Sequence, residues 1–124
     1  MKKSQLKSFI FFTIILSISI YSLFDSNDQM KNLQKYFQNC EYEKAIDLAE
    51  IILKNPNLDK SDKTHAYIIK GVSEFSSNQT LNARITFAEL IMFDKNVRLS
   101  EKEVSPKIIE FFNDLKQKLL AENI

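Results

Sequence analysis

The sequence predicts an all-α protein, and three observations support this fold class. The 124 residues include only one glycine and two prolines, too few for the many tight turns of a sheet protein. After residue 25, apolar residues recur at helical spacing, and no segment alternates apolar and polar residues for long. Two stretches also repeat one pattern thirty-eight residues apart, as helical repeat proteins do.

The chain begins with an apolar stretch preceded by lysines. Lys2, Lys3 and Lys7 come before an uncharged run that ends at Phe24, which is the layout of a secretory signal. The apolar run is shorter than the about 20 residues that cross a bilayer comfortably. A cleaved signal peptide and a retained membrane anchor over residues 1–24 both stay open. In either case the lysines stay inside, so we expect residues 25–124 to be exported, either to the periplasm or held at the outer side of the inner membrane.

The exported part is slightly acidic. Three of the 17 basic residues precede residue 25, and all 16 acidic residues lie from Asp25 onward, so residues 25–124 carry a net charge of −2. This charge lacks the basic footprint of a nucleic-acid binder. The one cysteine cannot form an internal disulfide, so the domain must be stabilised by its packed core.

Five helices are expected after a short linker. The first two cover about residues 29–38 and 42–54, and the third opens near Ser61, whose hydroxyl can cap it. The fourth covers about residues 80–93. The last begins at Pro106, because proline suits the first helical position. Each helix carries one apolar stripe, and in chain order these are Met30, Leu33, Tyr36 and Phe37; Ala45, Leu48, Ala49 and Ile52; Tyr67, Ile68, Gly71, Val72 and Phe75; Ala83, Phe87, Leu90 and Ile91; and Ile108, Phe111, Phe112, Leu115 and Leu119.

The repeated unit resembles the tetratricopeptide repeat. The second unit has Gly71 at the small position of its first helix, Asn78 at the tight turn, and Ala83 and Phe87 at the alanine and aromatic positions. The first unit carries Cys40 where glycine is usual. The small residues would let paired helices approach closely, and asparagine tolerates the left-handed conformation of the turn.

The tail carries a second resemblance. Val104-Ser-Pro-Lys107 followed by Phe111-Phe112 is similar to a block that follows such repeats in exported bacterial proteins. Together the two resemblances imply two helical hairpins closed by a C-terminal capping helix. They also imply a surface that binds another protein, most simply a protein of the cell envelope.

The resemblance further implies a concave groove lined by the first helix of each pair. By register, its lining would be Met30, Gln34, Phe37 and Gln38 from the first unit, and His65, Ile68, Val72 and Phe75 from the second. Lysine and asparagine, with which some family members grip a terminal carboxylate, are missing from these positions. An apolar groove must be covered, either by the last helix or by a partner helix. Phe111 and Phe112 cannot both be buried by one helix face, so this pair is a possible partner contact.

Other candidate chemistry is sparse. His65 has no second histidine or cysteine at ligand spacing, which argues against a metal site. Cys40 has no basic neighbour in sequence to activate it. No phosphate loop or nucleophile elbow is present, so no catalytic residue and no cofactor are predicted. We expect a non-enzymatic adaptor or scaffold; the alternatives are an accessory subunit that folds fully on assembly and, less favoured, a small-ligand binder or hydrolase.

Overall fold

The computed structural model describes residues 27–122, and within this range the chain is all-helical, without strands. The predicted fold class is therefore confirmed for the described residues. The five helices span residues 27–38, Tyr42–Leu53 (α2), Lys60–Ser76 (α3), Thr80–Phe93 (α4) and Pro106–Glu122 (α5).

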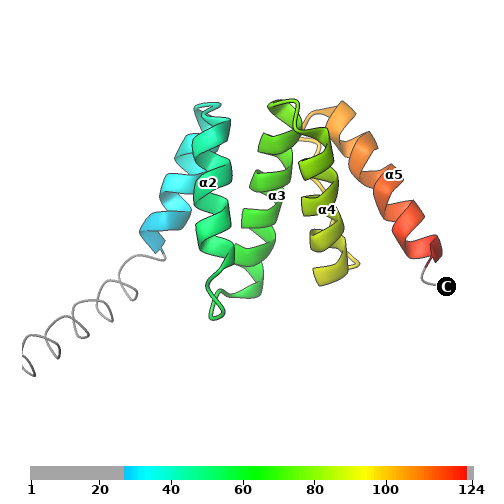
Figure 1. Cartoon of the computed structure of the whole chain (residues 1–124), viewed down its shortest axis with the longest axis horizontal. Helices are drawn as coiled ribbons and strands as arrows, with labels where there is room; N and C mark the ends of the chain where they lie inside the picture. Colours follow the sequence, from blue (N-terminus) through cyan, green and yellow to red (C-terminus); the bar gives the residue numbers. More distant parts are fainter. Residues whose placement is uncertain (1–26, 123–124) are drawn as a thin grey trace, which may run out of the picture.

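The helices stand side by side in chain order (Figure 1). Packing joins α2 to α3, α3 to α4, and α4 to α5. The helix over residues 27–38 lies beside α2 and starts at the end of the layer where α4 ends (Figure 1). For the first four helices this arrangement follows from the short turns, because a short connection brings consecutive helices together antiparallel. A longer connection, over residues 94–105, joins α4 to α5.

The turns before α2 and α4 have the same backbone geometry. Within residues 27–122, the non-glycine residues with positive φ are Cys40 and Asn78, at 58° and 63°, and they lie thirty-eight positions apart. The backbone hydrogen bonds of the two turns also match. The N–H of Cys40 donates to Phe37 O and that of Asn78 to Phe75 O, both at 3.1 Å. The N–H of the next residue donates to Tyr36 O in the first turn and to Glu74 O in the second, both at 2.8 Å. The sequence echo therefore corresponds to a repeated turn, and the predicted left-handed residue at Asn78 is confirmed.

Two apolar clusters form the core. One joins Leu33 to small residues of α2 and α3, and the other surrounds Phe87 between α3, α4 and α5. Gly71 faces the Phe87 ring so closely that a Cβ atom there would lie 2.3 Å from Cε1. The small residue at this position therefore permits the close approach of α3 and α4.

The residue that caps α3 differs from the prediction. Asp59, not Ser61, caps α3: its carboxylate accepts from the backbone N–H of Asp62 at 2.8 Å. The cap lies two residues earlier because Asp59 has the extended backbone that an N-cap requires, whereas Ser61 is already helical. The helix α5 begins at Pro106, as predicted.

The predicted signal or anchor over residues 1–24 lies outside the described residues. Within residues 27–122, no helix has the length and apolar character needed to cross a bilayer.

Candidate partner-binding groove

The predicted groove divides into a closed half and an open half. In the closed half, the C-terminal part of α3 contributes Val72 and Phe75. Val72 is only 4% exposed and belongs to one cluster with Val97 and Val104 of the connection between α4 and α5. Phe75 is half-buried and packs against Phe111, with ring centroids 5.0 Å apart. The protein's own chain therefore occupies this half.

The aromatic pair of α5 divides between the core and its edge. Phe112 has no exposed surface and meets Phe87 edge to face, with centroids 5.3 Å apart. Phe111 is half-buried and contacts both Phe75 and Phe87. As expected, the two rings are not both fully buried, but Phe112 and Val72 lack the exposed surface that a partner contact needs. They belong to the core because the connection and α5 fold back onto α3.

The open half contains a pocket of about 250 Å³ between the first helix, α3 and the α4–α5 connection. Five of the predicted groove residues meet there, although the register prediction took them from two separate helices. The complete lining is Gln34, Phe37, Gln38, His65, Ile68, Ile69, Glu103 and Val104. Met30 does not line this pocket, because it packs against the cluster around Leu33.

A hydrogen bond fixes one wall of the pocket. The His65 Nε2 atom lies 2.7 Å from the Gln34 Oε1 atom, across thirty-one residues of sequence. With His65 protonated at Nε2, the ring donates and the amide oxygen accepts. This hydrogen bond pairs the His65 ring with the Gln34 amide oxygen. The exposed polar side chains at the rim of the pocket are then Gln38 and Glu103.

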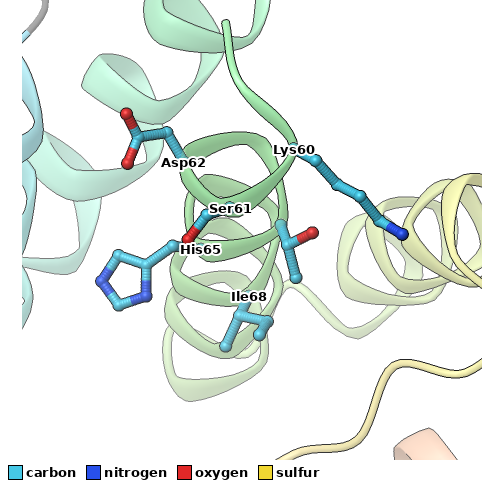
Figure 2. A pocket seen from close by; sticks show the side chains of 6 residues that line it. Lys60, Ser61, Asp62, His65 and Ile68 are labelled. Carbon is cyan, nitrogen blue, oxygen red and sulfur yellow. The ribbon is translucent and has the colours of Figure 1, made fainter.

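A second, wider hollow of about 700 Å³ adjoins the pocket along the N-terminal half of α3. It shares His65 and Ile68 with the pocket. Figure 2 shows Lys60 and Asp62 pointing to opposite sides of α3, with His65 beside Ser61 and Ile68 further along the helix. The open half is thus a continuous depression along α3.

Sequence reasoning missed the contribution of the α4–α5 connection. Glu103 and Val104 line the pocket from a segment about seventy residues away from Gln34. A signal was present, because Val104 is an isolated apolar residue just before the Ser-Pro start of α5, but nothing local indicates which surface it covers.

A buried polar cluster lies outside the groove, between α3 and α4. Lys70 Nζ lies 3.2 Å from the Glu74 carboxylate and 2.8 Å from Thr86 Oγ1, and Thr86 donates to Glu74. Lys70 also approaches Glu50 of α2 at 3.9 Å. Because these groups satisfy one another away from either hollow, they hold three helices in register and do not form a reactive site.

The described residues offer little for metal or acid–base chemistry. They contain no group of three histidine, cysteine or acidic side chains that could hold a metal ion. Burial raises the pKa of Tyr67, and the nearby Glu89 carboxylate raises it further. A hydrogen bond with the exposed Cys40 thiol is the main cause that raises the pKa of Tyr42. Neither tyrosine lines the groove.

The comparisons with known proteins give no relative. No protein-family model matches the chain, and neither a curated protein nor a solved structure matches it. The likeness to tetratricopeptide repeats therefore stays a prediction from the sequence.

Proposed function

We propose that this chain is a non-enzymatic interaction module of the bacterial cell envelope, in which two tetratricopeptide-like hairpins and a capping helix present the open half of the groove to a partner protein. The observation that carries the proposal is the pocket in that half. Helices from both repeat units and the connection before the capping helix converge on it. A binding surface assembled from separate units is the expected mode of action of a helical repeat.

The pocket suits one large apolar side chain of the partner. Its volume of about 250 Å³ exceeds the about 150 Å³ that accommodates a benzene ring in an engineered protein cavity. Phe37, Ile68 and Val104 supply apolar walls, and each is at least half-buried. An anchor that fills such a pocket supplies most of the affinity of many interfaces, so the remaining contacts need only be complementary.

The rim adds a preference in charge. Glu103 is exposed and is the one acidic residue of the lining, whereas the other lining residues have apolar, amide or imidazole side chains. A basic residue next to the apolar anchor of the partner would therefore be favoured.

A small-ligand binder would need convergent polar groups that remain free to contact a ligand. Here the polar pair on one wall of the pocket, Gln34 and His65, is joined by a hydrogen bond. The free polar groups, Gln38 and Glu103, are exposed at the rim. This division favours a protein anchor over a small polar ligand.

Photo-crosslinking from the groove tests the proposal. A benzophenone side chain at Gln38 of the full-length chain, in the native envelope, should capture one partner protein. The same side chain at Lys35 is the matched control, because Lys35 is equally exposed on the same helix but does not line the pocket. Glu103→Trp, which places a large ring at the rim, should abolish the Gln38 crosslink. Glu103→Lys should weaken it.

Equal capture from Gln38 and Lys35, or a Gln38 crosslink that survives Glu103→Trp, would refute the groove as the binding surface. Circular dichroism of each variant verifies that it is folded. Phe75→Asp is a poor test, because Phe75 packs against Phe111 and a carboxylate there would unfold the domain.

A further inference from the structure

The outer face of α4 is unusually apolar for a surface. Leu81, Ile85 and Met92 are 70%, 52% and 66% exposed. The opposite side of α4 is buried in the core through Ala83, Phe87 and Leu90, so this helix is apolar on both sides. A helix with that composition is normally covered all round. The outer face is separate from the groove, so what covers it is a question independent of the proposed function.

The three exposed side chains and the half-buried Ala88 follow coiled-coil spacing. Leu81, Ile85, Ala88 and Met92 are separated by four, three and four residues, which is the spacing of the d, a, d and a positions of a heptad. They form one narrow seam along the helix. A seam of this shape fits a single second helix lying nearly parallel to its axis, and it fits a flat or irregular surface poorly.

The charges beside the seam identify the second helix. Arg84 and Glu89 flank it on opposite sides, at the g position of one heptad and the e position of the next. In a parallel two-stranded pair, a g residue faces the e residue five positions later on the other helix. Arg84 and Glu89 are five positions apart. Two copies of α4 side by side would therefore form the Arg84–Glu89 ion pair twice.

Both charged groups are available for this contact. Neither Arg84 nor Glu89 belongs to an ion pair among the residues that the structure describes, and both are exposed. The Arg84 guanidinium lies over the Phe111 ring, 5.9 Å from its centroid, which steadies it beside the seam.

We propose that the chain self-associates through this seam, with two copies of α4 packed in parallel about a two-fold axis along the helix. An antiparallel pair would bring Arg84 to the side that carries Arg84 of the second copy, and likewise for Glu89, so the charges select the parallel arrangement. Residue 27 lies at the end of the layer where α4 ends (Figure 1). A two-fold axis along α4 keeps this end on the same side in both copies.

The seam is short. Its four positions span eleven residue steps, about 16 Å of helix, so the dimer should be reversible and depend on concentration. Weak contacts of this size become effective when both copies are held on one surface, because tethering raises their effective concentration.

Disulfide trapping tests the arrangement in the full-length chain in mild detergent. With Cys40→Ser as background, Ile85→Cys and Ala88→Cys should each give a covalent dimer on oxidation, because like positions face each other in a parallel pair. Ile51→Cys is the matched control, since Ile51 is 55% exposed but lies on α2. Crosslinking of Ile51→Cys as efficient as that of Ile85→Cys would overturn the proposal.

Charge reversal tests the pairing. Arg84→Glu or Glu89→Arg alone replaces two attractive contacts with two repulsive ones and should weaken association by roughly tenfold. The double variant Arg84→Glu/Glu89→Arg should recover it, as sedimentation velocity would measure. These positions are exposed, so the variants should remain folded, as circular dichroism verifies.

Three results would overturn the proposal. The first is a monomer at all concentrations without trapping at Ile85. The second is preferential trapping between Ile85→Cys and Ala88→Cys in a mixture, because that pairing belongs to an antiparallel seam. The third is failure of the double charge variant to recover association.

Discussion

Replacing Gly71 by alanine tests how tightly α3 and α4 are packed, because two opposing effects act at this position. In an ordinary helix interior, glycine to alanine stabilises by about 0.5–1 kcal/mol. Here the new Cβ would lie 2.3, 2.6 and 2.8 Å from three carbons of the Phe87 ring. Distances under about 3 Å cannot be accommodated unless the ring moves.

The ring has little room to move. Phe87 is fully buried and packs against Phe111 and Phe112, with centroid distances of 6.3 and 5.3 Å. Overpacking of such a core costs about 1–3 kcal/mol. After subtraction of the helix-propensity gain, Gly71→Ala should destabilise the protein by about 0.5–2 kcal/mol. Since 1 kcal/mol corresponds to about 4–8 °C for a domain of this size, the Tm should fall by several degrees.

Thermal unfolding followed by circular dichroism measures the effect, and a second background isolates its cause. Phe87→Leu removes ring atoms next to Gly71. In the Phe87→Leu background the Gly71→Ala substitution should become neutral or stabilising by up to about 1 kcal/mol. A higher Tm for Gly71→Ala in the otherwise native chain would refute the close approach. An equal loss of stability in both backgrounds would refute the ring as its cause.

Three further predictions concern stability. Thr86→Val should destabilise the protein by about 1–3 kcal/mol, because it removes the donor to the buried Glu74 carboxylate. Ser73→Ala should be neutral or stabilising, because the buried Ser73 hydroxyl has no partner among the described residues. Urea unfolding compares the two variants, and a greater loss of stability in Ser73→Ala would contradict the reasoning. Cys40→Gly should raise stability by about 1 kcal/mol, because Cys40 has a φ of 58° and glycine adopts this left-handed conformation without strain. A lower Tm would show that the lost contacts of the Cys40 thiol stabilise the protein more than the relief of backbone strain does. The pKa of Tyr67 is raised in the folded protein, so the contribution of Tyr67 to stability is intact below its unfolded pKa of 10.0 and is lost as pH rises through the folded-state pKa. Tyr67→Phe should therefore flatten the fall in Tm above pH 10.0. Identical plots of Tm against pH for the two proteins would refute this.

The sequence predicted the helices well because their signals are local. Apolar spacing located α4 at residues 80–93 without error, and proline at its first position located the start of α5. The cap of α3 was misplaced because Asp59 and Ser61 are both good capping residues, and only the backbone conformation distinguishes them.

The groove was predicted only in part. Register within each helix correctly grouped Gln34, Phe37, His65 and Ile68, which meet at one pocket. Register could not show that Val72 is covered, because the covering residues come from the connection after α4.

By itself, the sequence determined the all-helical class of residues 27–122, most helix limits and the repeated left-handed turn at Cys40 and Asn78. These features depend on the conformational preferences of a few neighbouring residues, and such preferences do not require contacts with distant parts of the chain. The tertiary structure alone decided that the α4–α5 connection closes half of the groove and that the apolar seam of α4 faces outward. Those outcomes depend on which apolar surfaces meet across long stretches of chain, and hydrophobic attraction is non-directional, so no local pattern specifies them.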